Sequence, residues 1–430
     1  MKKLIDDLCA FLDSSPVNFL AVDTVRRRLE SAGFTELDMR SEWAVAPGDR
    51  RYVVKNGSAI FAFVAGTEAP AAGFNIIAAH SDSPGFRLKP NCEMPCEGTA
   101  VKLNTEVYGG PILYTWFDRP LSIAGRVILR SDNPLQPESR LLAVKRPLMV
   151  IPHLAIHFNR AVNEGNKLSK QKDMLPVVAL GAPTAKNLVR SLVAEELGIE
   201  AGDILDYDLS LYNTEGARTV GVDNSMICSG RLDDLSMVHA GLTALLDAAD
   251  VPSPHTRVLA VFDNEETGSG TKQGAGSPVL EHILRRICMA YGATDDSMFM
   301  RAVASSFMIS ADNAHGYHPN YGEKYDPTNH PVLGGGPCIK VNANCKYMTD
   351  ADSAAVFASL CERAGVPFQY FVNHSDVLGG STLGNLLTSQ IPLRGVDMGA
   401  PVWAMHSACE TASCADHAYT VAAFTEFMKL

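Results

Sequence analysis

Apolar residues at the start of the chain recur with the spacing of amphipathic helices. The positions over residues 4–12 repeat at i, i+4, i+7 and i+8, and Ser14-Ser15-Pro16 ends the pattern. A second face of this kind covers residues 22–32 and ends at Gly33. The chain is therefore predicted to begin with two consecutive helices.

The pattern then changes to the two-residue period of strands. Residues 51–54 and 58–65 alternate on either side of Asn56-Gly57, which predicts a β-hairpin. The run Phe74–Ala79 is almost entirely apolar and does not alternate between apolar and polar residues. It predicts a buried central strand.

The rest of the chain contains two regions that differ in their pattern of predicted strands and helices. Residues 92–223 carry short strand-like runs between Gly, Pro and Asn turns, at 100–103, 121–129 and 141–144, with one helix predicted over Ala185–Leu197. After Arg231, helical and strand patterns alternate, over residues 235–248, 257–262, 279–291, 306–310, 351–364, 368–372 and 417–430. This alternation predicts an α/β layered domain. We predict a discontinuous α/β domain (residues 1–91 and 224–430) and a β-rich insertion (residues 92–223).

Charge and composition exclude several classes of protein. The 430 residues include 37 Lys and Arg against 48 Asp and Glu, a net charge of −11, so the basic stripe that nucleic acid requires is not expected. Asp6 and Asp7 interrupt any signal-peptide core, and the charge-free stretch Val377–Leu393 is polar enough to predict loop and strand, not a membrane span. The 10 cysteines show no zinc-finger spacing, which favours reduced thiols in a cytoplasmic protein.

Histidines and carboxylates gather in five short segments, each where a predicted strand ends or a helix begins. The segments are His80-Ser81-Asp82, Asp233-Asp234, Asp263-Asn264-Glu265-Glu266, Asp312-Asn313-Ala314-His315 and His406. In open α/β sheets, ligands bind at that edge. Most of these residues also have a purely structural interpretation, as a helix N-cap (Asp233), solvated loop charge or core histidines. Asp312 is the exception, because a buried carboxylate after an apolar strand needs a cation or several donors.

One interpretation accounts for all five segments together. Two histidines and three or four carboxylates without thiolates suit Zn²⁺, Mn²⁺ or Co²⁺. Two such metals, about 3.5–4 Å apart, need one bridging carboxylate and leave a position for water. Asp82 would accept the other ring N–H of His80, and one of two adjacent glutamates can ligate while the other serves as general base.

In their order and spacing, these segments resemble the aspartyl aminopeptidase family, two-metal exopeptidases that assemble into hollow tetrahedral particles. The motifs that carry the resemblance are His80-Ser81-Asp82-Ser83-Pro84-Gly85, Gly230-Arg231-Leu232-Asp233, Asp263-Asn264-Glu265-Glu266-Thr267-Gly268, Ser310-Ala311-Asp312-Asn313-Ala314-His315 and Ala404-Met405-His406-Ser407. The predicted insertion adds the family-like stretches 115–120 and 151–157. The resemblance covers nearly the whole chain.

The resemblance implies a three-layer α/β metallopeptidase domain with a central mixed sheet, plus an inserted β-rich dimerisation domain. It implies two divalent ions per subunit, zinc in the first place and cobalt or manganese as alternatives. The implied ligands form two sets that share a bridging carboxylate, one of His80, Asp233 and Asp312 and one of Asp233, Glu266 and His406. Glu265 would be the general base, and Asp82 would orient His80.

The implied activity is hydrolysis of N-terminal Asp or Glu from peptides by a water that two metals activate. His315, Lys340 and Tyr347 would bind the substrate, with Asn313 and Ser381 in the same neighbourhood. His157 would act across a subunit interface. Without the resemblance, Lys340 is a solubilising lysine at a strand edge and His157 a surface turn residue.

Two alternatives stay open. The same chemistry could serve neutral or hydrophobic N-terminal residues, or the chain could be a catalytically inactive scaffold. The residues favour the acidic preference, because His315 and Lys340 supply positive charge, and they favour an enzyme, because every ligand has a candidate. The implied partners are peptides with free N-termini and further copies of the chain, as dimers joined into a tetrahedral dodecamer; no nucleic acid or membrane is expected.

Overall fold

A computed structural model describes residues 1–68, 70–181, 186–377 and 379–430. The chain divides into two compact units. The first unit consists of the segments Met1–Asp82, Ala217–Met405 and Glu410–Leu430, and the second of Ser83–Gly216 and His406–Cys409. That residues 92–223 form a separate inserted domain remains a prediction.

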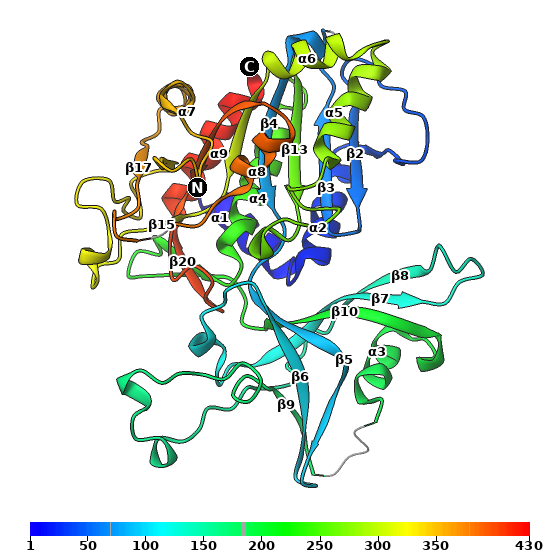
Figure 1. Ribbon diagram of the computed structural model, residues 1–430, viewed down its shortest axis with the longest axis vertical. Helices are drawn as coiled ribbons and strands as arrows, with labels where there is room; N and C mark the ends of the chain where they lie inside the picture. Colours follow the sequence, from blue (N-terminus) through cyan, green and yellow to red (C-terminus); the bar gives the residue numbers. More distant parts are fainter. Residues whose placement is uncertain (69, 182–185, 378) are drawn as a thin grey trace. The chain divides into compact units, whose positions relative to one another are not determined.

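A mixed sheet of nine strands, counted over the described residues, forms the centre of the first unit (Figure 1). From edge to edge its strands are β1 (Thr35–Glu36), β2 (Arg50–Lys55), β3 (Ala59–Val64), β13 (Thr256–Phe262), β4 (Phe74–His80), β14 (Phe307–Ala311), β18 (Arg394–Gly399), β16 (Cys338–Lys340) and β17 (Gln369–Phe371). The four strands β13, β4, β14 and β18 run parallel to one another. Their carboxyl ends therefore meet at one edge of the sheet.

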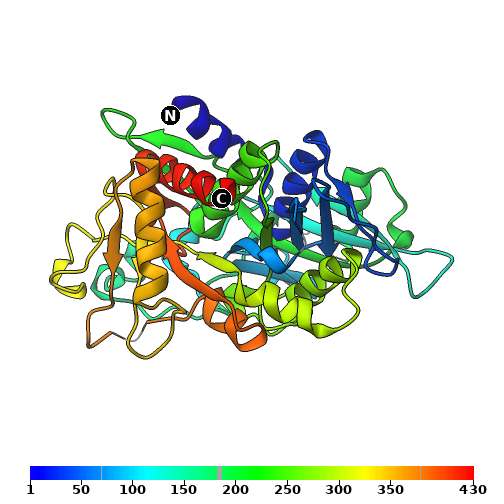
Figure 2. The ribbon, with the colours of Figure 1, turned by 90° about the horizontal axis from the view of Figure 1, so that it is seen from above.

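Two apolar cores lie on opposite faces of this sheet. In β4, Ile77 and Ala79 pack into one core, while Phe74, Ile76 and Ala78 pack into the other. The first core is completed by α1 (Lys2–Ser14), α2 (Asn18–Ser31), α4 (Leu232–Ala248), α7 (Ala351–Ala364) and α9 (Cys414–Lys429). The second core is completed by α5 (Val279–Ala290), α6 (Asp296–Ala304) and α8 (Leu383–Gln390). Figure 2 shows helices on both sides of the strands, so the expected three-layer α/β arrangement is confirmed.

The sequence pattern gave most of these elements but not α8. The predicted hairpin is β2 paired antiparallel with β3. The prediction of loop and strand for 377–393 is wrong over α8, because Leu383 and Leu387 lie one helical turn apart and both are buried against the second core. Residue 378 of that stretch and residue 185 of the predicted helix 185–197 lie outside the described residues; the helix itself is α3 (Leu188–Leu197).

The second unit contains an antiparallel sheet, with six strands in the part of the chain that is described. Its order is β8 (Glu138–Ala143), β7 (Leu121–Leu129), β10 (Ile204–Asn213), β5 (Gly85–Cys96), β6 (Ala100–Tyr108) and β9 (Val177–Leu180). Trp116 packs edge-on against Phe86, with ring centroids 5.0 Å apart, within the apolar core of this unit. On β10, Asp208 pairs with Arg126 at 2.7 Å and with Arg87.

A further small sheet in the first unit holds two residues close to the predicted site. Over the described residues it contains β11 (Arg218–Val220), β12 (Met226–Ser229), β20 (Glu410–Ser413), β19 (Pro401–Trp403) and β15 (Ala314–His315). The buried Glu410 is the first residue of β20, and His315 is the last residue of β15. Among the described helices, none combines the length and the apolar character that a membrane crossing requires.

A buried histidine pair joins the helices of the first core. His239 on α4 lies with its Nε2 2.8 Å from Asp7 Oδ2 on α1 and its Nδ1 3.0 Å from His417 Nε2 on α9. Arg28 on α2 also binds the Asp7 carboxylate, at 2.8 and 3.1 Å. Since His239 donates from Nε2 to Asp7, its Nδ1 accepts from His417, and both rings are neutral. Burial lowers the pKa of both histidines, that of His417 well below its usual range.

This arrangement predicts a specific loss of stability in acid. A histidine whose pKa is lowered in the folded state contributes stability that is complete above about pH 6.5 and is lost as pH falls below it, at up to about 1.4 kcal/mol per pH unit. The urea midpoint of unfolding should therefore decrease between pH 7 and pH 5. In His417→Gln this decrease should be smaller, while the exposed His282→Gln should behave like the parent. An equal pH dependence in all three proteins would contradict the assignment.

Candidate metal centre

The carboxyl ends of three parallel strands bring predicted site residues together. His80 ends β4, Asp312 directly follows β14, and Asp263 directly follows β13, which leads to Glu265 and Glu266 in a short 3-10 helix, Glu265–Thr267. Asp233 joins them from the start of α4, which packs on β4. These positions belong to one unit and one sheet edge, as the sequence predicted.

Four buried side chains at this edge form a tight group. The ligand atoms of His80, Asp233, Asp234 and Asp312 all lie within 4.8 Å of one another. The His80 Nε2 atom is 3.6 Å from Asp233 Oδ1. A second group of the same compactness joins His80 with Glu265 and Glu266. One imidazole and several carboxylates in this spacing are the donor set of a zinc or manganese site.

The orientation of His80 suits a metal ligand. Its Nδ1 lies 3.0 Å from the main-chain oxygen of Asp82 and 3.4 Å from the Asp82 carboxylate. A proton on Nδ1 is donated to these oxygens, which puts the ring lone pair on Nε2, the atom that faces Asp233. The predicted partnership between Asp82 and His80 is therefore present in geometry, with the main-chain carbonyl as the nearer acceptor.

The Asp82 carboxylate has a second task that the sequence did not reveal. Its two oxygens accept the backbone N–H groups of Glu265, at 3.1 Å, and of Glu266, at 3.2 Å. The turn that carries both glutamates is thereby held next to the His80 strand. One carboxylate thus positions a predicted ligand, the predicted base and the first predicted histidine together.

Two further carboxylates support the site: Asp234, to which the sequence analysis gave no role, and Glu410, which it did not single out. Asp234 Oδ2 accepts the backbone N–H of His80 at 3.1 Å, while its buried Oδ1 has no hydrogen-bond partner among the described residues. Glu410, which is 1% exposed, accepts the backbone N–H of Asp233 at 3.1 Å. The only sequence signal for Asp234 is its place beside Asp233, and Glu410 lies 177 residues from the group it holds.

The electrostatics of the group show a shortage of positive charge. Burial raises the pKa of Glu265 to about 8. His80 acts to lower this pKa, while the charges of Asp312 and Asp233 raise it further. Burial and the neighbouring carboxylates also raise the pKa of Asp234 well above its usual range. These carboxyl groups are held where each disfavours the ionisation of the next. A divalent cation fits this group for two reasons. It would bind the buried Asp234 oxygen that has no hydrogen-bond partner within the described part of the chain, and its charge would let the neighbouring carboxyl groups ionise.

Lys340 provides one positive charge at the edge of the group. Its Nζ lies 3.3 Å from Asp312 Oδ1 and 5.8 Å from the ring centroid of Tyr347. Both Lys340 and Tyr347 are buried, whereas His315 is exposed on β15. Lys340 and Tyr347 thus lie close to Asp312, while His315 follows Asp312 by three residues along the chain.

Two predicted site residues belong to the second unit. His406 lies in the segment His406–Cys409, and its Nδ1 is 3.1 Å from the carbonyl oxygen of Gly110. A proton donated to this oxygen leaves the lone pair on Nε2, the tautomer that a metal ligand needs. His157 is exposed in a short 3-10 helix, Ile156–Phe158. The roles of both histidines stay predictions.

Comparison with known proteins agrees along the whole chain. Residues 11–428 match the model of the family described as "Aminopeptidase I zinc metalloprotease (M18)". A "Probable M18 family aminopeptidase 2" of Clostridium novyi (strain NT) is 47% identical over 431 residues, covering 100% of this chain and 99% of the relative. Among solved structures, the "Cryo-EM structure of the Ape4 and Nbr1 complex" matches with a TM-score of 0.96 and 34% identity, over 100% of this chain and 86% of that one. The "Structure of S. cerevesiae mApe1 dodecamer" matches with a TM-score of 0.87 and 26% identity, over 100% and 97%.

The geometry predicts that two substitutions separate metal binding from catalysis. Asp233→Ala removes the predicted bridging carboxylate and should lower the zinc content measured by mass spectrometry after dialysis. Glu265→Gln is nearly isosteric and should keep the metal while activity falls by about 10²–10⁴-fold. Asp247→Ala, on the exposed side of the same helix as Asp233, is the matched control and should retain both. Full zinc content in Asp233→Ala would contradict the bridging role.

Proposed function

The chain belongs to the M18 family of zinc metallopeptidases, which are aminopeptidases, and we propose that it removes acidic residues, Asp or Glu, from peptide N-termini. The observation that carries this proposal is the buried ammonium group of Lys340 beside the metal group. Lys340 is 3% exposed, and a lysine so deeply buried requires an anion.

The surroundings of Lys340 keep it charged. Burial alone would lower the pKa of Lys340, but Asp312, Tyr347 and Asp397 hold it above its usual range. Asp312 is its only close carboxylate among the described ion pairs, and Asp312 is also a predicted metal ligand. When a divalent cation takes up the charge of Asp312, Lys340 is left to bind another anion. An acidic side chain of the substrate fits that place through a charge-assisted hydrogen bond.

We assign the metal ligands as the resemblance implies. His80, Asp233 and Asp312 would hold one ion, and Asp233, Glu266 and His406 the other, with Asp233 bridging. Zinc follows from the description of the family. When bound, such ions supply Lewis-acid polarisation of the scissile carbonyl and acidify a water. The buried, carboxylate-rich group around His80 supports at least one of these sites.

The residues of the chain then have distinct tasks in the hydrolysis. Glu265 takes a proton from the attacking water and returns it to the leaving amine. Asp82 holds Glu265 in place through the backbone N–H of that residue. Lys340, with His315 and Tyr347, binds the acidic side chain and so aligns the scissile bond with Glu265. As for an aminopeptidase in general, the substrate is a peptide with a free N-terminus.

The second unit supports assembly into a homo-oligomer. Three apolar side chains flank His157 on its surface: Leu154 is 57% exposed, Ile156 48% and Phe158 81%. An exposed cluster of this kind marks a contact surface. A solved relative is described as a dodecamer. We propose that this surface forms a dimer, that dimers join into a tetrahedral dodecamer in the cytoplasm, and that His157 reaches the site of its partner subunit.

The acidic preference predicts a selective effect of Lys340→Met. The kcat/KM for an Asp anilide should fall by about 10- to 100-fold relative to that for a Leu anilide, through loss of a hydrogen bond to a charged group. Lys346→Met, at an exposed lysine nearby, is the control. Zinc content is measured in parallel, because Lys340 also contacts Asp312. Equal losses on both substrates, or faster turnover of Leu than Asp by the parent, would favour a neutral or hydrophobic preference.

The role proposed for His157 predicts complementation between inactive chains. His157→Ala and Glu265→Gln chains are mixed under conditions that exchange subunits. In a mixed dimer, the site with intact Glu265 receives His157 from its partner, so about a quarter of all sites should be active after random pairing. Native mass spectrometry verifies the hybrids. No gain above either parent in verified hybrids would show that His157 does not act across the interface.

A further inference from the structure

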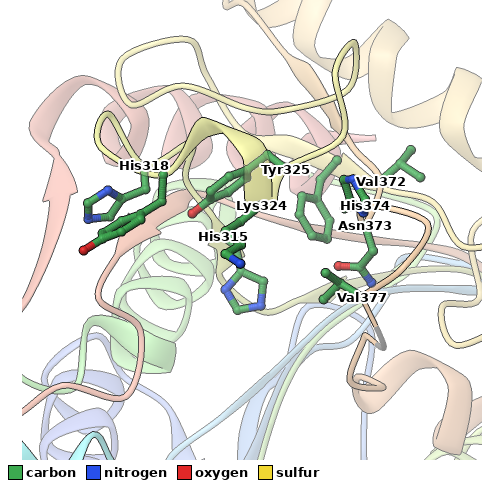
Figure 3. A pocket seen from close by; sticks show the side chains of 10 residues that line it. His315, His318, Lys324, Tyr325, Val372, Asn373, His374 and Val377 are labelled. Atoms are coloured by element: carbon green, nitrogen blue, oxygen red, sulfur yellow. The ribbon is translucent and has the colours of Figure 1, made fainter. Parts of the chain in front are cut away.

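A pocket of about 390 Å³ opens in the first unit, between residues 315–325 and residues 371–377 (Figure 3). Its basic lining side chains are His315, His318, Lys324 and His374. None of the described residues that line it is Asp or Glu, although the net charge of the chain is −11. The composition of the pocket therefore favours an anionic ligand.

The hydrogen bonds of two histidines make them donors to such a ligand. His318 Nδ1 accepts the backbone N–H of Asn320 at 3.2 Å. In the same way, His374 Nδ1 accepts the backbone N–H of Asp376 at 3.2 Å. A ring nitrogen that accepts carries no proton, so each imidazole has its N–H at Nε2. Both rings are thus fixed by the backbone as N–H donors, which suits a carboxylate oxygen.

The remaining walls are aromatic and aliphatic. Tyr321, 56% exposed, Tyr325 and Phe371 line the pocket together with Val377. The ring of His315 lies edge-on to Phe371, with centroids 5.8 Å apart. Apolar walls with a few polar donors suit a carboxylate carried on a short aliphatic stem, as in an amino-acid residue.

The pocket borders the residues assigned to the first substrate residue without being the same place. His315 belongs to both sets, and Asn373, which lines the pocket, lies close enough to Tyr347 to lower the pKa of its hydroxyl group against the effect of burial. Lys340 and Tyr347 themselves do not line the pocket. An enzyme that removes one N-terminal residue has nothing to bind on the amino side of that residue. If a second pocket next to the first binds part of the substrate, that part is the peptide that follows the scissile bond.

We propose that this pocket binds a carboxylate of the leaving peptide, so that the enzyme prefers substrates with negative charge just after the cleaved bond. The proposal rests on the aminopeptidase function proposed above. The carboxylate has two possible sources, the side chain of an acidic second residue or the free C-terminus of a dipeptide. His318, Lys324 and His374 bind it in both cases.

The test compares matched peptides with the zinc-loaded, full-length protein. One arm uses Asp-Glu-Ala amide and Asp-Gln-Ala amide, which differ in one charge and have no free C-terminus. The other arm uses Asp-Ala and Asp-Ala amide, which differ only in the C-terminal carboxylate. In at least one arm, the charged peptide should have a kcat/KM about five- to tenfold higher, mainly through KM. The arm that shows the difference identifies the source of the carboxylate.

The variants are chosen to remove donors and keep the fold. Asparagine at position 318 or 374 can accept the same backbone N–H with its Oδ1, and its amide N–H groups, on a shorter side chain, do not reach the position of the Nε2 donor. In the triple variant His318→Asn, Lys324→Met, His374→Asn, the ratio between charged and neutral peptide should fall to about one. Lys324→Met alone changes only an exposed side chain and should lower the ratio partly. Lys3→Met, an exposed lysine outside the pocket, should leave the ratio at the parent value.

The outcomes separate this proposal from the one on which it rests. Turnover of an Asp anilide, which has no second residue, tests the proposed function alone. If the anilide shows a different N-terminal preference, the peptide series is repeated with the preferred residue, and the ratios still decide about the pocket. A ratio of one in both arms for the parent, or an unchanged ratio in the triple variant, would overturn the proposal.

Discussion

The burial of several carboxylates around one histidine is the constraint on which the site depends. Asp82, Asp233, Asp234 and His80 are each at most 3% exposed, and Asp312 is 8% exposed. Burial, together with like charges this close, opposes ionisation, so the pKa of Asp234 is raised well above its usual range and that of Glu265 to about 8. A fold keeps such a group only where something else offsets its cost. A divalent cation meets that need, and the same cation gives the enzyme its chemistry.

Hydrogen bonds from the backbone hold this group in place. Asp82 accepts from Glu265 and Glu266, Asp234 from His80, and Glu410 from Asp233. In each case a carboxylate fixes the main chain that carries a predicted ligand or base. The polar residues around the site therefore form two layers. The residues of the inner layer face the reaction, and the residues of the outer layer hold the inner ones in place. Such supporting residues limit how far a ligand can move when the metal leaves.

The sequence predicted the elements better than the connections between them. The apolar run Phe74–Ala79 predicted β4, and the motif after it identified His80 and Asp82, because both signals are local. The helix α8 was not predicted, because polar residues surround its two buried leucines, Leu383 and Leu387. Glu410 could not be found, since nothing local links it to Asp233.

The same distinction explains which parts of the candidate site the residues alone could give. The residues alone gave the segments and a nitrogen and oxygen donor set for two metals, and the resemblance to the family added the grouping of His80, Asp233 and Asp312, whose ligand atoms lie close together. The pairing of Lys340 with Asp312 needed the packing of β16 beside β18. The pocket between residues 315–325 and 371–377 had no sequence signal, because two distant loops create it.

The order of strands in the central sheet has a consequence for synthesis on the ribosome. β4 is complete when residue 80 has been made, but its two neighbours are β13, which begins at Thr256, and β14, which begins at Phe307. Until then, a strand that is fully buried in the final fold has both edges without a partner, while Ser83–Gly216, the long segment of the second unit, is being translated. Open apolar edges of this kind invite pairing with other chains. The nascent chain is therefore expected to need shielding by a chaperone for longer than a protein whose sheet forms in chain order.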